Sequence, residues 1–159
     1  MQYHFDGFRP GDPELHEPNG TSPSHSDEVD AAIVGCGPAG LTLAAQLAAI
    51  GGLNVRIFEK RDGPLKVGQA DGIACRSMEM FEAFGFVDRV ARESYWVNVT
   101  SFWRPSPETI GICRADRIQD VEDDISHQPH TILSQARIHD FYLDLMSKSA
   151  SRLKPDYNR

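Results

Sequence analysis

Three glycines in one short stretch constrain the fold of this chain more than any other feature. The run AAIVGCGPAGLTLAAQ (residues 31–46) places Gly35, Gly37 and Gly40 between an apolar segment and an alanine-rich segment. Glycine permits tight turns and lets another group approach the backbone closely. The motif therefore predicts either a nucleotide-binding loop or a glycine-rich turn that joins a strand to a helix, and the flanking residues must decide between them.

The segments around these glycines follow the order strand, turn, helix, strand. VDAAIV (29–34) has the continuous apolar character of a buried strand. PAGLTLAAQLAAI (38–50) indicates a helix, because proline stands at its start and two glycines follow its end. LNVRIFEK (53–60) indicates a second strand. This order predicts a parallel βαβ unit with a right-handed crossover, the core of a Rossmann-like α/β fold.

Glu59, at the end of the second predicted strand, completes a dinucleotide-binding pattern. In such folds an acid at this position accepts hydrogen bonds from the adenosine ribose, and its charge disfavours a 2′-phosphate. Gly35 would permit the tight turn, Gly37 the approach of the pyrophosphate, and Gly40 the close packing of helix on strand. The helix N-terminus would supply N–H donors to the phosphates. The pattern therefore favours FAD or NAD over NADP, with a ligand-free βαβ turn as the alternative.

Composition narrows the class of protein further. The chain has 159 residues, enough for about one domain, and its net charge of -7 argues against nucleic acid as a partner. No apolar run approaches the length of a membrane span. The three cysteines form no CxxC pair, so neither a disulfide framework nor a metal site is expected. Because the N-terminus shows no secretory signal pattern, we expect a cytoplasmic protein.

The chain divides into two regions of different composition. Residues 1–27 are rich in proline, glycine, histidine and serine and predict a flexible leader, whereas 28–159 carry the periodic segments of a folded domain. Beyond the βαβ unit, the patterns indicate a long loop at 61–76, helices at 77–85 and 86–94, strands at 95–105 and 110–116, an acidic solvated loop at 120–124, a short strand at 130–135 and an amphipathic helix at 136–151.

The glycine-loop run and two further runs together carry a resemblance to a known family. VGQADGIACRSMEMFEAFG (67–85), together with IVGCGPAGLTLAAQLA and HTILSQARIHDFYL, resembles the FAD-dependent aromatic hydroxylases, in the branch of phenol 2-monooxygenase and 3-hydroxybenzoate 4-monooxygenase. The resemblance extends over nearly the whole chain, including the leader MQYHFDGFRPGDP. It implies a flavoprotein monooxygenase in which NADPH reduces FAD, and O2 then supplies the oxygen that enters a phenol ring next to its hydroxyl.

The same resemblance implies roles for individual residues. Gln69, Ala70 and Asp71 would pass beside the flavin, and Asp71 would also meet the phenolic hydroxyl of the substrate. His130 falls where the hydroxybenzoate branch has a substrate-binding histidine, and Gln135 would contact the cofactor from a strand-to-helix turn. The residues expected around the rest of FAD are Gly35, Gly37, Pro38, Ala39 and Gly40 at the pyrophosphate and Glu59 at the adenosine ribose.

Plainer interpretations of two of these residues remain open at the level of sequence. Asp71 followed by Gly72 is also a common turn pair, although a carboxylate that orients a phenol proton suits electrophilic oxygen transfer. His130 follows Pro129, where a structural or solvated histidine is equally in keeping with the pattern.

Length sets this chain apart from the family it resembles. Those hydroxylases are several times longer, and this chain lacks their later DG and GD motifs. We therefore expect 28–159 to be the N-terminal part of an FAD-binding domain, poorly stable alone and with little hydroxylase activity, because a sheet edge and an apolar face would be exposed. The alternatives are a truncated, non-catalytic remnant, or another FAD- or NAD-dependent oxidoreductase such as a disulfide reductase, which the absence of CxxC disfavours.

Overall fold

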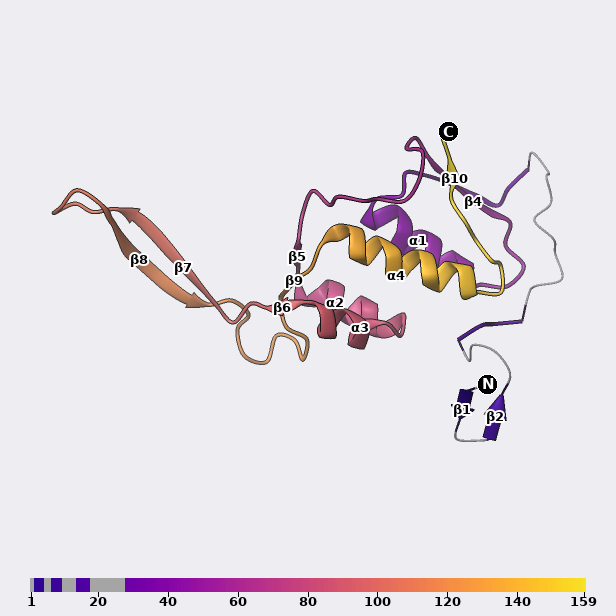
Figure 1. Ribbon diagram of the computed structural model, residues 1–159, viewed down its shortest axis with the longest axis horizontal. Coiled ribbons are helices and arrows are strands. Elements are labelled where there is room, and N and C mark those ends of the chain that lie inside the picture. The colour runs from indigo at the N-terminus through magenta and orange to yellow at the C-terminus, as the bar shows by residue number, and fades with distance from the viewer. Residues whose placement is uncertain (1, 5–6, 10–13, 18–27) are drawn as a thin grey trace. The chain divides into compact units, whose positions relative to one another are not determined.

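A computed structural model describes residues 2–4, 7–9, 14–17 and 28–159 of the chain. These residues form two compact units (Figure 1). The first unit combines the described residues up to Val67 with Gln135–Arg159, and the second comprises Gly68–Ser134. The chain therefore begins the first unit, builds the second, and returns to complete the first.

The first unit contains the βαβ arrangement that the sequence predicts. Strands β3 (Ala31–Val34) and β4 (Val55–Glu59) pair in parallel, with Ala31 opposite Val55, and helix α1 (Pro38–Ala48) connects them. A third strand, β10 (Asp156–Tyr157), lies parallel to β4 on its other side. The sequence did not predict β10, because two residues are too short to show a periodic pattern.

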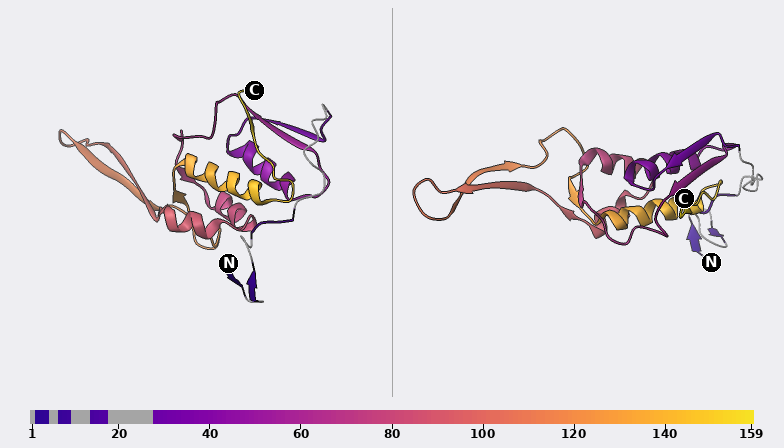
Figure 2. Two further views of the ribbon diagram at one scale, coloured as in Figure 1. Left: turned by 45° about the vertical axis from the view of Figure 1, so that its right-hand side comes forward. Right: turned by 90° about the horizontal axis from the view of Figure 1, so that it is seen from above.

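Helices α1 and α4 (Gln135–Lys148) lie side by side in the first unit (Figures 1 and 2). The buried face of α1 is mostly alanine, and small side chains let a neighbouring helix approach closely. The hydroxyl oxygens of Thr42 and Tyr142 are 2.8 Å apart and join the two helices by a hydrogen bond. The buried residues of the two helices are Leu41, Ala44, Ala45 and Ala48 of α1 and Ile138, His139, Phe141, Tyr142 and Met146 of α4.

The second unit is built around a small antiparallel sheet and two helices. The sheet has the order β5 (Gly72–Ile73), β9 (Thr131–Ile132), β6 (Tyr95–Trp96). Strand β5 lies inside the segment 61–76, which the sequence predicted to be a loop throughout. The loop prediction was therefore wrong at Gly72 and Ile73. These residues form a strand because they pair with β9, which is distant in sequence.

Helices α2 (Cys75–Ala83) and α3 (Val87–Glu93) follow β5. Gly85 separates them and adopts a φ of +82°, the left-handed conformation that favours glycine after a helix. The predicted helix at 77–85 is confirmed, although it begins two residues earlier. The core of these helices consists of Met78, Phe81, Phe86 and Val90.

Strands β7 (Val99–Pro105) and β8 (Ile112–Gln119) form an antiparallel hairpin that extends away from α2 and α3 within the second unit (Figures 1 and 2). The strand register shifts between Phe102 and Trp103. Side chains on both faces of this hairpin are largely exposed. The predicted strands at 95–105 and 110–116 are thus confirmed, with the first divided into β6 and β7.

The N-terminal region is described in part. Strands β1 (Gln2–His4) and β2 (Gly7–Arg9) pair with each other in antiparallel fashion. Farther along, the backbone N–H of His16 donates to the carbonyl of Lys148 (3.0 Å) in the first unit. The flexible leader expected at 1–27 stays a prediction, since 1, 5–6, 10–13 and 18–27 lie outside the described residues. Across the part of the chain that the structure describes, every helix is too short or too polar to cross a membrane.

Candidate functional site

The glycine loop of the first unit makes a sharp turn between β3 and α1. Gly35 has a φ of +100°, a conformation that side-chain-bearing residues rarely adopt, and its N–H donates to the carbonyl of Phe58 (2.7 Å). Gly37 is the residue before the helix, and Pro38 is the first helical residue. Among the residues that the structure describes, no side chain caps the start of α1. Because the first N–H groups of a helix have no partner inside it, this turn offers backbone donors to a phosphate.

Two glycines of the loop differ in what surrounds them. A Cβ on Gly40 would lie 2.0 Å from the carbonyl oxygen of Gly35, a distance that no side chain can occupy. A Cβ on Gly37 would meet no atom of the described residues within 4 Å. Gly40 is therefore required by the contact of helix and turn, whereas the space at Gly37 is open to a ligand. The close helix contact at Gly40 and the open space at Gly37 are both features of loops that bind the pyrophosphate of a dinucleotide.

Glu59 is tied directly to this loop. Its side chain is buried, and Oε2 accepts the backbone N–H of Cys36 (2.8 Å) while Oε1 accepts that of Arg61 (3.0 Å). Burial alone would raise the pKa of the Glu59 carboxyl, but these two donors and the nearby Arg61 charge outweigh it, so the pKa lies below its usual value. The group is thus a carboxylate at neutral pH. Each oxygen keeps a further lone pair for a hydroxyl donor such as a ribose.

Three other buried groups near the loop were not anticipated from the sequence. Burial and the Glu59 charge raise the pKa of the Cys36 thiol to about 11, so it stays protonated at neutral pH. Within the described residues, the Tyr157 hydroxyl and His139 Nδ1 are buried without a hydrogen-bond partner. Burial raises the pKa of Tyr157 and lowers that of His139, so both are neutral. Cys36 lies within the loop itself, whereas His139 and Tyr157 lie on α4 and β10, far along the chain, where no local pattern marks them.

Asp71 and Gly72 begin the sheet of the second unit. The Asp71 side chain is exposed, and its carbonyl accepts the N–H of Leu133 (2.9 Å). Gly72 belongs to β5 and pairs with Ile132, so the turn interpretation of this dipeptide is wrong at Gly72. Gln69 and Ala70 precede Asp71 and are exposed.

His130 lies against this same backbone. A Cβ on Gly72 would be 3.4 Å from Nε2 of His130. The other ring nitrogen, Nδ1, is 2.5 Å from Oδ2 of Asp120, and Oδ1 of Asp120 accepts the Thr100 hydroxyl at 2.9 Å. The hydrogen bond from His130, more than that from Thr100, holds the pKa of the Asp120 carboxyl below its usual value. The expectation of a fully solvated loop at 120–124 is therefore wrong for Asp120, whose side chain is 15% exposed.

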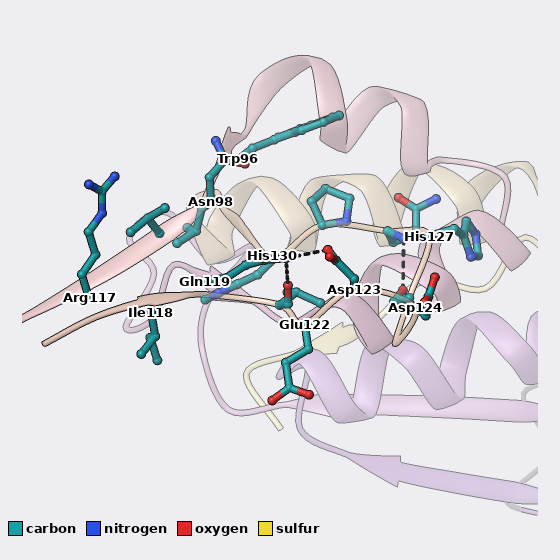
Figure 3. A pocket seen from close by; sticks show the side chains of 16 residues that line it. Trp96, Asn98, Arg117, Ile118, Gln119, Glu122, Asp123, Asp124, His127 and His130 are labelled. Carbon is teal, nitrogen blue, oxygen red and sulfur yellow. Dashed lines mark hydrogen bonds between the residues drawn. The ribbon is translucent and has the colours of Figure 1, made fainter.

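An open depression of about 710 Å³ adjoins His130 in the second unit (Figure 3). Its lining comes from Trp96 and Val97, from the base of the β7–β8 hairpin, including Asn98 and Gln119, and from the segment 121–130. Near it, the Nε2 atom of His127 is 2.5 Å from Oε2 of Glu82 on α2. The Glu82 carboxylate raises the pKa of the exposed His127 ring.

The structure thus gathers the sequence-predicted residues into two groups. In the first unit, Glu59 is hydrogen-bonded to the turn that contains Gly35, Gly37, Pro38, Ala39 and Gly40. Gln135 is the first residue of α4 in the same unit, with its side chain half-buried. In the second unit, Asp71 directly precedes Gly72, and Nε2 of His130 lies 3.4 Å from the position of a Cβ on Gly72. Their roles toward a cofactor or substrate stay predictions.

Comparison with known protein families gives one match that spans most of the chain. Residues 28–153 match the model of the FAD binding domain family. This range includes the whole second unit, most of the first unit without β10, and the complete glycine loop.

Curated relatives include two hydroxylases. A 3-hydroxybenzoate 4-monooxygenase from Comamonas testosteroni is 53% identical over 164 residues, which cover 100% of this chain and 26% of the relative. A phenol 2-monooxygenase from Aspergillus fumigatus is 34% identical over 100 residues, or 63% of this chain and 17% of the relative. The chain therefore spans about a quarter or less of the length of these relatives.

Solved structures of similar fold include a hydroxylase and a monooxygenase. Aklavinone-11 hydroxylase in complex with FAD and aklavinone is 24% identical, with a TM-score of 0.62 over 84% of this chain and 26% of that chain. The p-nitrophenol 4-monooxygenase of Pseudomonas putida is 17% identical, with a TM-score of 0.68 over 80% of this chain and 31% of that chain. At these identities the likeness concerns the fold alone.

Proposed function

This chain belongs to the FAD-binding-domain family, and from that premise we propose that it is the N-terminal, cofactor-binding part of a flavin-dependent monooxygenase that hydroxylates phenolic substrates with NADPH and O2. The observation that carries the proposal is the glycine loop. It combines a helix contact that only Gly40 can make, open space at Gly37, and a buried carboxylate, Glu59, bonded to the loop backbone. Bound FAD would supply the redox and oxygen-activating chemistry.

The residues of this chain would bind and orient FAD and the substrate. In the proposal the turn of Gly35, Gly37 and Gly40 holds the pyrophosphate through backbone donors, and Glu59 accepts the ribose hydroxyls. Asp71 would accept or orient the phenolic proton, which increases the electron density of the ring that receives oxygen. His130, half-buried beside Gly72, would contact a polar substituent of the ring. Gln69, Ala70 and Gln135 would line the flavin.

The relatives' names guide the choice of substrate class. A 3-hydroxybenzoate 4-monooxygenase is 53% identical to this chain over the whole length of this chain. A hydroxylated benzoate is therefore the first substrate to test. Because the chain covers 26% of that relative, residues outside this chain would supply the rest of the substrate pocket and the reaction with NADPH. The cytoplasmic location expected from the sequence stays a prediction.

Cofactor binding by the chain tests this proposal directly. We expect the purified chain to retain FAD after desalting, seen in its visible absorption spectrum, and to bind NAD much more weakly. Gly37→Val should reduce FAD binding at least tenfold without unfolding the chain, because its side chain would occupy open space that the pyrophosphate needs. Gly63→Val is the matched control, since a Cβ there also meets nothing within 4 Å.

The outcomes separate the alternatives. A folded chain that binds NAD in preference to FAD would favour a different oxidoreductase. A folded chain that binds neither would contradict the proposal and favour a remnant. Little NADPH oxidation in the presence of FAD and 3-hydroxybenzoate is expected from a cofactor-binding part, and robust turnover would show that the chain is catalytically sufficient.

A further inference from the structure

We propose that Asp120 is a positioning residue for His130, whose ring it fixes in the Nδ1–H tautomer with Nε2 directed at the β5 backbone beside Asp71. The inference rests on the proposed function in one respect only, namely that Nε2 would face the phenolic substrate. The placement of the ring and of its proton is argued from the second unit alone.

The hydrogen bonds of Asp120 determine which nitrogen carries the proton. Oδ2 of Asp120 faces His130 Nδ1 at 2.5 Å, and Oδ1 accepts the Thr100 hydroxyl at 2.9 Å. A carboxylate can only accept hydrogen bonds, so Nδ1 of His130 must be the donor. In the neutral ring Nε2 is then left as an acceptor.

The backbone holds both partners in place. The N–H of Asp120 donates to the carbonyl of Asn98 (3.1 Å), and the N–H of Val97 donates to the carbonyl of His130 (2.9 Å). Both partners are thus anchored to the short segment that joins β6 to β7. Thr100, which completes the contacts of the Asp120 carboxylate, lies on the adjoining strand β7. Asp120 directly follows β8 and His130 directly precedes β9, so both side chains are carried by backbone that is hydrogen-bonded to the segment Val97–Asn98.

The free nitrogen has a defined neighbour. Nε2 would be 3.4 Å from a Cβ placed on Gly72, so the ring faces this strand at a point where no side chain intervenes. Asp71 is the preceding residue, and its carbonyl is bonded to the N–H of Leu133. Nε2 can accept a hydrogen bond from a hydroxyl when the ring is neutral, or donate one to a carboxylate when it is protonated.

His127 offers an internal contrast in the same segment of chain. It is also paired with an acid, but its Nε2 atom faces Glu82 and its side chain is 66% exposed. The carboxylate of Glu82 therefore favours the opposite, Nε2–H tautomer. The structure thus predicts two histidines, three residues apart, with opposite tautomers.

Nitrogen NMR of the histidine rings tests the inference in the 15N-labelled 159-residue chain, without flavin or substrate. At the alkaline limit of its own titration, His130 should be predominantly the Nδ1–H tautomer and His127 the Nε2–H tautomer. Resonances are assigned by comparison with His130→Gln and His127→Gln. Asp120→Ala should reduce the Nδ1–H population of His130 to less than half and leave His127 unchanged. Glu122→Gln also removes one negative charge, from an exposed residue near Asp120, and should leave the tautomers of both His130 and His127 unchanged.

Several results would overturn the inference. One is a wild-type His130 that is mainly Nε2–H, and another is an Asp120→Ala variant that keeps the wild-type tautomer. If Asp120→Ala does not fold, Thr100→Val is the deciding variant, because it removes the hydroxyl that donates to Oδ1 of Asp120. It should lower the Nδ1–H population of His130 by a smaller amount. An unchanged population would count against the inference. Failure of the chain to bind FAD would contradict the proposed function and leave these tautomers unaffected.

Discussion

The glycine loop of the first unit and the Asp120–His130 pair of the second unit differ in how the chain specifies them. The loop is specified by steric constraints within six consecutive residues, since a Cβ on Gly40 would meet the Gly35 carbonyl at 2.0 Å. The pair is specified by polar contacts between segments that come together only after folding. We conclude that a side chain at the close contact of Gly40 should primarily affect stability, whereas substitutions around the pair should primarily change the tautomer of the His130 ring.

Gly40→Ala should give the largest effect and is the strongest test of this contrast. The added Cβ would overlap a backbone oxygen that cannot move without opening the turn, which should cost about 3 kcal/mol of unfolding free energy. Urea denaturation should show a lower midpoint with an unchanged m-value. Gly63→Ala, with open space around it, should stay within about 0.5 kcal/mol of wild type. An equally stable Gly40→Ala chain would remove the steric basis of the comparison.

Glu59→Gln should give the next largest effect, about 2 kcal/mol, because the buried carboxylate accepts two backbone N–H groups. Its pKa in the folded chain is below the ordinary value, so this stabilisation is present above about pH 4.3 and is lost as pH falls through the folded-state pKa. Unfolding free energies measured from pH 7 to pH 3 should therefore fall more steeply for wild type than for Glu59→Gln. Asp62→Asn, at an exposed site, is the control, and parallel curves for wild type and Glu59→Gln would contradict the expectation.

Gly72→Ala tests whether the second unit tolerates an added methyl group better than the glycine loop does. Its Cβ would be 3.4 Å from a ring nitrogen of His130, which is ordinary contact with a side chain that can adjust. We therefore expect a stability change below about 1 kcal/mol, in contrast to Gly40→Ala. The His130 ring resonances in the NMR spectrum should shift clearly. A loss of stability as large as that of Gly40→Ala would mean that the second unit is as sterically constrained as the loop.

Glu82→Gln should give the smallest effect. The Glu82 carboxylate raises the pKa of His127, so the pair contributes stability below the ordinary histidine pKa and loses it as pH rises through the raised value. Removing the charge should return the His127 midpoint toward its ordinary value, as followed by NMR titration. Because both side chains are exposed, the thermal midpoint should hardly change. A large drop in that midpoint would identify this exposed pair as structurally important.

The difference between constraints within consecutive residues and contacts between distant segments also explains what the sequence could and could not predict. The strands β3 and β4 and the helix α1 follow from contiguous patterns, and the spacing from the glycines to Glu59 predicts that this acid lies beside the loop. The interaction of Asp120 with His130 and the addition of β10 to β4 leave no local pattern. Arg56, for example, pairs with Asp156 (2.6 Å), one hundred positions along the chain. Strand β5 was not predicted because its two residues form a strand only by pairing with Thr131 and Ile132, which are distant in sequence.

The pairing of β5 with β9 has a consequence for the architecture of the first unit. The chain enters the second unit at Gly68 and leaves it at Ser134. Close to these two ends, the N–H of Leu133 donates to the carbonyl of Asp71 at 2.9 Å. An insertion whose two ends are already joined imposes little loop-closure entropy on the domain that hosts it, however many residues it contains. The second unit is therefore a module that could be lengthened, shortened or exchanged at its hairpin without altering the connection from β4 to α4.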